Sequence, residues 1–266
     1  MKDRIGFFSP VPIEFIIKKK FDPIFIPYLI SISEKPDNSF EESENSGFLQ
    51  NSPFIVKTGI NIILKYNITN IIFAVPTDIR EVLSIPDLLN KKISYFLINY
   101  HNKTQSIEEF ENWLNNLKNR DIEENYPAIQ TDFNKILKIY NKSTNNIKKK
   151  LPNIAIMGDY PLNPNLLKII NNKANILFIE TLELFKKTND FAIFTNINYK
   201  LKYFENILNK KNISHIILLS STFSSIINYE IILREFFVKK RLLTIEMNNT
   251  GNLNENVKLR IESFLT

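Results

Sequence analysis

Residues 214–266 indicate the fold most clearly, in the stretch SHIILLSSTFSSIINYEIILREFFVKKRLLTIEMNNTGNLNENVKLRIESFLT. The apolar, branched run at 216–219 has the length of a buried strand, and a turn rich in serine and threonine follows it. Apolar residues then recur at helical spacing from 227 to 237, before a second short buried strand at 242–245. This alternation predicts a parallel sheet covered by helices.

The same alternation extends through the rest of the chain. Helical patterns separate further short apolar runs, which predict strands at 4–8, 24–26, 71–75, 93–98, 154–157 and 176–179. The expected fold class is therefore α/β, with two flavodoxin- or Rossmann-like units that each contain a parallel sheet.

The character of the sequence changes between the two halves. Two amphipathic helical patterns follow residue 102, and a charged, asparagine-rich stretch at 141–150 ends this region. We therefore predict an N-terminal α/β unit at 1–101, a short helical segment and linker at 102–150, and a C-terminal α/β unit at 151–266.

The composition excludes several classes of site. The chain of 266 residues has no cysteine, which removes disulfides, thiolate nucleophiles, zinc–thiolate sites and cysteine-ligated iron–sulfur clusters. Its two histidines, His101 and His215, border strand-like runs, so we expect structural roles for both. None of its five glycines falls in a phosphate-binding or dinucleotide-binding pattern.

The net charge of +6 could favour acidic partners. However, the lysines are scattered, and the tight runs at 18–20 and 148–150 are short, so we interpret them as solvated faces and expect no nucleic-acid partner. The chain begins without a signal-peptide pattern, and no apolar stretch approaches the length of a membrane span. We therefore expect a cytoplasmic protein without a membrane partner.

The candidate site residues that follow from the sequence pattern are polar residues at the ends of predicted strands. In α/β sheets, ligands bind at the carboxyl ends of the strands. Glu180 and Glu246 lie at such ends and could face one cleft, although solvated or capping roles fit each of them equally well.

Several stretches in order resemble the 2-hydroxyacyl-CoA dehydratase and benzoyl-CoA reductase family, in particular its D-component members. They are IGFFSPVPIEFI (5–16), EESENSGFLQNSPFIVKTG (41–59), IIFAVPTD (71–78), NIAIMGDYPLNPNLLKII (153–170) and the C-terminal run that ends in RIESF (260–264). The resemblance covers most of the chain, although the regions at 102–150 and 189–198 look shorter than in the family.

The resemblance implies two flavodoxin-like units with a cysteine-ligated 4Fe-4S cluster between them, an ATP-dependent activator and an acyl-CoA substrate. The family's cysteines fall here on Pro53, Ile79 and Ser224, or within two residues of the first two positions. Because proline and isoleucine offer no donor atom, and a single serine oxygen cannot hold a cluster, we expect no 4Fe-4S cluster and predict no cofactor.

The resemblance also suggests residues for a ligand cleft. Ser9 matches the small polar residue that the family keeps near the substrate thioester, and Glu246 and Arg260 match polar positions of the C-terminal motif. Asn248 stands where the family has an acidic residue. Ser224, as a lost ligand position that retains a hydroxyl, completes the candidate set.

Two functions of different class follow from these features. The first is a cluster-less, non-catalytic or accessory subunit that pairs with a cysteine-containing homologue in a heterodimer, or with itself in a homodimer. The alternative is an iron-independent protein or enzyme that binds acyl-CoA or another small ligand in the cleft between the units. A stand-alone interaction protein is a third reading, and the sequence does not decide whether the chain is an enzyme.

Overall fold

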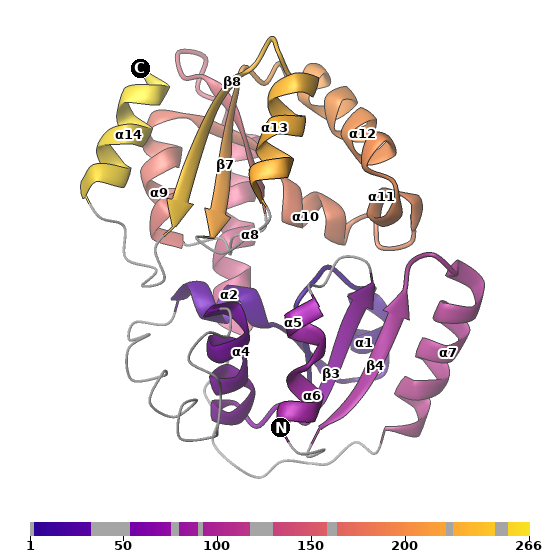
Figure 1. The fold of residues 1–266 in the computed structure, drawn as a ribbon. Helices are drawn as coiled ribbons and strands as arrows, with labels where there is room; N and C mark the ends of the chain where they lie inside the picture. The colour runs from indigo at the N-terminus through magenta and orange to yellow at the C-terminus, as the bar shows by residue number, and fades with distance from the viewer. Residues whose placement is uncertain are drawn as a thin grey trace. The chain divides into compact units, whose positions relative to one another are not determined.

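The protein is an α/β chain with two parallel sheets, as the sequence predicts. The structure is a computed structural model that describes residues 3–32, 54–75, 80–89, 93–117, 130–158, 164–221, 226–247 and 255–266. The chain divides into two compact units (Figure 1). Unit 1 comprises Met1–Ile30, Lys35–Ala128 and Leu184–Ile197, and unit 2 comprises Ser31–Glu34, Ile129–Glu183 and Asn198–Thr266.

Sheet A lies in unit 1 and has the order β2-β1-β3-β4, with every neighbouring pair parallel. Its strands are β1 (Arg4–Phe7), β2 (Asp22–Phe25), β3 (Asn70–Val75) and β4 (Ser94–Asn99). The helices that connect and follow them are α1 (Ile13–Lys18), α2 (Ile26–Ile32), α4 (Phe54–Lys65), α5 (Arg80–Leu83), α6 (Ile85–Leu88) and α7 (Lys103–Asn116).

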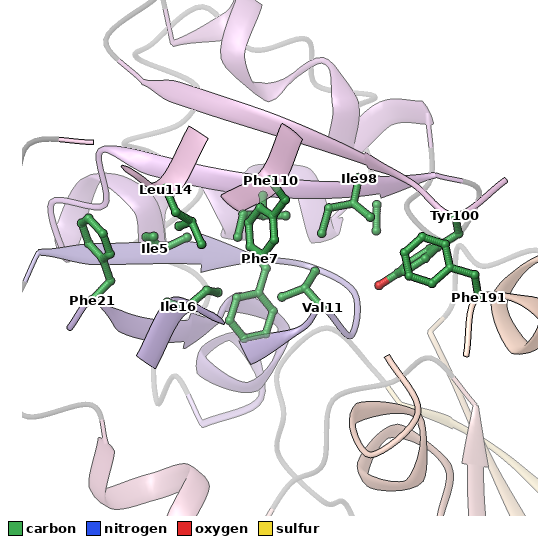
Figure 2. Close-up of a cluster of buried hydrophobic side chains, with 12 residues drawn as sticks. Ile5, Phe7, Val11, Ile16, Phe21, Ile98, Tyr100, Phe110, Leu114 and Phe191 are labelled. Atoms are coloured by element: carbon green, nitrogen blue, oxygen red, sulfur yellow. The ribbon is translucent and has the colours of Figure 1, made fainter. Parts of the chain in front are cut away.

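Helices cover both faces of sheet A because its strands are apolar on both sides. On one face, Phe7 of β1 and Ile98 of β4 belong to a buried cluster that includes Ile16 of α1 and Phe110 of α7 (Figure 2). On the other face, Phe8 stacks on Phe73 with ring centroids 6.1 Å apart. The helices α2 and α4 pack closely on this face. A Cβ atom at Gly6 would lie 2.9 Å from Ile26 of α2, and one at Gly59 of α4 would lie 2.9 Å from the ring of Phe8.

A segment from the second half of the chain completes the core of unit 1. Within Leu184–Ile197, the ring of Phe185 packs against Phe25 with centroids 5.3 Å apart, and Phe194 stacks on Tyr100 at 4.3 Å. Phe191 meets the same tyrosine edge-on at 4.8 Å (Figure 2). Unit 1 is therefore discontinuous in sequence, and its core depends on aromatic residues that follow the first strands of unit 2.

Sheet B lies in unit 2 and has the order β6-β5-β7-β8, again parallel throughout. Its strands are β5 (Asn153–Gly158), β6 (Asn175–Ile179), β7 (His215–Ser221) and β8 (Arg241–Met247). The helices of the second half are α8 (Gln130–Asn145), α9 (Pro164–Lys173), α10 (Glu180–Phe185), α11 (Ala192–Thr195), α12 (Ile197–Lys210), α13 (Ile226–Phe236) and α14 (Glu255–Leu265). Helix α9 packs on α8 and α14, and Phe204 of α12 packs on Phe178 of β6 with centroids 5.1 Å apart.

Several elements differ in detail from the sequence-based prediction. Ile26, expected to end a strand, begins α2 instead. The apolar spacing of Val82, Leu83 and Leu88 predicts one helix with a kink at Pro86, and the described part of this segment is two short helices that meet at Ser84, because Pro86 favours the start of a helix over its interior. The region 102–150 contains α7, which belongs to unit 1, and α8, which belongs to unit 2. In the described part of the chain, no helix combines the length and apolarity needed to cross a bilayer.

Candidate functional site

The carboxyl edge of sheet B gathers polar groups from four elements. Strand β5 ends at Gly158, whose φ of +109° lies in a region that favours glycine. A Cβ atom at this position would lie 2.1 Å from the carbonyl oxygen of Leu219, so only glycine lets β5 end this close to β7. The Gly158 N–H donates to Oε2 of Glu180 at 2.9 Å.

Glu180 follows β6 directly as the first residue of α10, and only 4% of it is exposed. Its Oε1 atom lies 2.5 Å from Nζ of Lys200 and accepts a hydrogen bond from the Tyr229 hydroxyl at 3.1 Å. A buried carboxylate is tolerated only when it is paired and hydrogen-bonded, and here both oxygens have donors. We call Gly158, Glu180, Lys200 and Tyr229 the Glu180 cluster.

Lys200 and Tyr229 reach the carboxylate from α12 and α13. The Lys200 ammonium lies 5.1 Å from the centroid of the Tyr229 ring and 5.5 Å from that of Phe204, which adds cation–π attraction to the ion pair. One-fifth of the Lys200 side chain is exposed. The cluster can therefore fix the ends of β5 and β6 and present one cation to an acidic group of a ligand.

A second buried polar pair borders the Glu180 cluster along α10. The Tyr140 hydroxyl of α8 donates to Oε1 of Glu183 at 3.0 Å. Burial first, and the adjacent Glu183 carboxylate second, raise the pKa of the Tyr140 phenol far above its ordinary value. The Tyr140 hydroxyl therefore acts as a hydrogen-bond donor to this carboxylate.

The carboxyl edge of sheet A also buries polar residues. Ser9, two residues after β1 ends, is only 9% exposed. The helix α4, whose Gly59 lies against Phe8, buries Lys57, Thr58 and Asn61. Unit 1 thus has hydroxyl, amide and ammonium groups in its interior near the position where parallel sheets bind ligands.

The structure places some of the residues predicted for a ligand cleft. Ser9 belongs to unit 1, whereas Glu246 and Arg260 belong to unit 2, on β8 and α14. Arg260 Nη2 donates to the carbonyl oxygen of Thr244, two residues before Glu246, at 3.0 Å. Pro53, Ile79 and Ser224 lie outside the described residues, as does the side chain of Glu246.

Glu180 is predictable from its place at a strand end, whereas the two side chains that bind it are not. Lys200 and Tyr229 lie within stretches of helical apolar spacing or beside them, and nothing in their local sequence distinguishes them from neighbouring lysines and tyrosines. The carboxylate at a strand end was the only available signal. Among the described residues, no group of three or more histidine, aspartate or glutamate side chains could hold a metal ion.

No protein-family model and no curated protein matches this chain. The dehydratase-like pattern therefore depends only on the residues quoted above.

Proposed function

We propose that this chain is a cluster-less relative of the 2-hydroxyacyl-CoA dehydratase and benzoyl-CoA reductase subunits that acts as a non-catalytic or accessory subunit. One observation carries the proposal: a single cysteine-free chain contains two all-parallel four-stranded sheets with the same strand order. This tandem arrangement is the one that the sequence resemblance implies. The missing thiolates remove the ligands with which the family holds its cluster.

The positions of the family-like stretches support the same proposal. The stretch at 5–16 covers most of β1 and the start of α1, and the one at 153–170 covers β5 and most of α9. The stretch at 71–78 covers most of β3, and 260–264 lies in α14. Each unit therefore contributes the end of its first strand and the following helix, where such folds bind ligands.

The proposed partner is a homologue that retains the cysteines, in a heterodimer. The test is anaerobic affinity purification of the tagged chain from its own host, followed by mass spectrometry and by assays of iron and sulfide. We expect a stoichiometric cysteine-containing homologue to elute with the chain, and the iron to belong to that partner. Elution of the chain alone, or stoichiometric iron and sulfide in the isolated chain, would contradict the proposal.

A second candidate function is binding of an acyl-CoA or another small acidic ligand, without iron. The partly exposed Lys200 ammonium at the carboxyl edge of sheet B favours it, since this edge is where α/β sheets bind phosphate-bearing ligands. Calorimetric titration with acetyl-CoA tests it. We expect saturable binding that Lys200→Met abolishes and that Lys202→Met, an exposed neighbour on α12, preserves. Equal binding by the two variants would exclude a role for Lys200.

A further inference from the structure

The amino edge of sheet B gathers basic residues that are far apart in the sequence. Each strand of a parallel sheet is preceded by a connection at this edge, and the four connections of sheet B all carry lysine or arginine. We call this set the amino-edge patch: Lys148, Lys149, Lys150, Lys173, Lys210, Lys211, Lys239, Lys240 and Arg241. The segments 146–153, 171–175, 209–215 and 237–241 contain no acidic residue.

The strand register brings these connections together. At the start of the strands, Asn153 pairs with Asn175, and His215 pairs with Arg241. Hydrogen bonds join the loops, because Asn175 Nδ2 donates to the carbonyl oxygen of Lys148 at 3.0 Å and Asn153 Nδ2 donates to that of Lys211 at 3.1 Å. The loop before β8 lies at the end of unit 2 where β7 and β8 begin (Figure 1).

The patch carries more positive charge than the neighbouring helix C-termini and acidic side chains offset. The helices α8, α9, α12, α13 and α14 end at this edge, since Phe264 of α14 packs on His215 and Arg241, and each C-terminus carries about half a negative charge, roughly −2.5 in total. The patch carries nine positive charges, so a large excess remains after the helix dipoles are offset. The acidic side chains Glu205, Glu235 and Glu262 on the adjoining helices reduce this excess by three.

The excess is also large relative to the whole chain. Removing the nine patch residues from the 34 lysines and arginines leaves 25 basic residues against 28 acidic ones, a net charge of −3. The nine patch residues are thus about a quarter of the basic residues of the chain.

Seven patch residues are exposed, and three bind the rest of the protein. The exposed ones are Lys148, Lys149, Lys150, Lys173, Lys210, Lys239 and Arg241. Lys211 Nζ donates to the carbonyl oxygen of Leu177 at 2.6 Å, Lys240 Nζ to that of Ile213 at 2.7 Å, and Arg241 Nη1 to His215 Nε2 at 3.0 Å. The exposed lysines therefore face solvent, whereas Lys211, Lys240 and Arg241 also make hydrogen bonds within unit 2.

Two exposed aliphatic side chains accompany the charge. Ile147, next to the lysines that precede β5, is 52% exposed, and Val238, next to those that precede β8, is 78% exposed. One strand, β7, separates β5 from β8, which sets the two loops about 10 Å apart at the typical strand spacing. Exposed aliphatic residues beside lysines fit a surface that is anionic outside and apolar just beneath.

Other anionic partners fit these residues less well. Single-stranded nucleic acid is held largely by aromatic side chains, whereas at this edge Phe237 is buried and Phe264, half-buried, packs on His215 and Arg241. Protein interfaces are depleted in lysine and enriched in arginine, whereas the patch contains eight lysines and one arginine.

We propose that the amino-edge patch, with Ile147 and Val238, docks on an anionic phospholipid surface. This inference goes beyond the proposed function and does not depend on it. Docking is electrostatic with shallow insertion of the two aliphatic side chains, so it requires no membrane-spanning segment. It also leaves the carboxyl edge of sheet B, with the Glu180 cluster, at the opposite ends of the strands.

The test is co-sedimentation of the full chain with vesicles of equimolar phosphatidylglycerol and phosphatidylcholine, or of phosphatidylcholine alone. We expect binding only to the anionic vesicles, and weaker binding as salt rises. A lysine near an anionic surface strengthens partitioning by about fivefold, so the triple variant Lys149→Glu, Lys150→Glu, Lys239→Glu, which removes three positive charges and adds three negative ones, should bind at least about a hundredfold more weakly. The matched control reverses the exposed mid-helix residues Lys138, Lys168 and Lys202, with a loss below about fivefold.

A second variant separates lipid docking from general attraction between charges. Ile147→Ser with Val238→Ser leaves the charge unchanged, and we expect several-fold weaker vesicle binding with no change in binding to a single-stranded oligonucleotide. Absence of binding to anionic vesicles, or equal losses in the two charge-reversed triple variants, would overturn the proposal. Oligonucleotide binding that is tighter than vesicle binding, with no effect of the aliphatic replacements, would assign the patch to nucleic acid instead.

Discussion

The ammonium of Lys200 lies 2.5 Å from the carboxylate of Glu180, and these two residues flank the segment Leu184–Ile197 that belongs to unit 1. Glu180 lies shortly before the chain leaves unit 2, and Lys200 lies shortly after the chain returns. The ion pair therefore joins the two ends of this excursion within unit 2. Tyr229 and the N–H of Gly158 hold the same carboxylate from α13 and β5.

Replacement of Lys200 by methionine should destabilise unit 2. The Glu180 carboxylate would stay buried without its cation, and breaking such a pair costs about 3 kcal/mol. Urea denaturation of Lys200→Met and of the double variant with Glu180→Gln measures this, and we expect the double variant to recover part of the loss. The control Lys202→Met changes an exposed lysine on the same helix and should stay within about 0.5 kcal/mol of the parent chain. Equal stability of the two single variants would show that the ion pair contributes nothing.

Gly158→Ala should be severely destabilising. Its φ of +109° is unfavourable for alanine, and the new Cβ would lie 2.1 Å from a backbone oxygen that cannot move without disturbing β7. We expect a loss above about 2 kcal/mol, from backbone strain and displacement together. At Gly6 the same change meets the ends of flexible side chains, Ile26 Cδ1 at 2.9 Å and Ile68 Cγ2 at 3.0 Å, so the loss should be smaller. Thermal unfolding of the two variants ranks them, and the reverse order would refute the explanation.

Phe185→Ala should destabilise unit 1, although the residue follows the second strand of unit 2 in sequence. The ring packs against Phe7 at 5.9 Å and Phe25 at 5.3 Å, and its loss leaves a cavity beside β1 and β2. The expected cost is about 2–3 kcal/mol, because the ring is only partly buried. Hydrogen exchange of the β1 and β2 amides measures it, and protection that is unchanged in these strands would contradict the assignment of the segment to unit 1.

Acidification should destabilise the protein through His215. Burial first, and the neighbouring Arg241 second, lower the pKa of His215 below its ordinary value of 6.5. The unfolded chain therefore binds more protons than the folded one just below that pH, so stability falls as the pH is lowered through about 6.5. In the neutral ring Nε2 accepts from Arg241 while Nδ1 donates to the Ser214 hydroxyl, and protonation of Nε2 removes the contact with Arg241.

The pH effect is tested by comparing the unfolding free energies of the parent chain and His215→Gln between about pH 7 and pH 5. Carboxylates titrate in both proteins, so the difference between the two curves isolates the histidine. We expect the variant to lose less stability on acidification. Parallel curves would show that His215 titrates alike in the folded and unfolded chains.

The strands were predictable because each is a short, branched apolar run with polar residues on either side. The run at 71–75 and the strand β3 at Asn70–Val75 agree to within one residue. The helix α2 was missed because its apolar residues continue directly from β2 without a turn signal. The helix α10 was missed for the same reason, since Glu180 follows the last strand residue Ile179 at once.

The candidate sites were predictable only where one residue carries the signal. Glu180 could be named from its place at a strand end, but its partners on α12 and α13 come from contacts between distant parts of the chain. The lysines of the amino-edge patch are scattered along the sequence, where Lys150 and Lys239 belong to separate short runs. The parallel sheet brings their loops to one edge, and charge gathered in this way is not visible before the topology is known.

Because unit 1 is discontinuous in sequence, its core cannot be completed during synthesis until part of unit 2 has been translated. Its sheet is synthesised first, yet Phe185, Phe191 and Phe194 leave the ribosome only after β5 and β6 have been translated. During that interval the apolar surfaces around Phe7 and Tyr100 are without their aromatic cover, and the nascent chain would depend on chaperones or on rapid elongation to avoid aggregation. Domains usually mature in the order in which they are made, whereas here the first unit is completed while the second is already being formed.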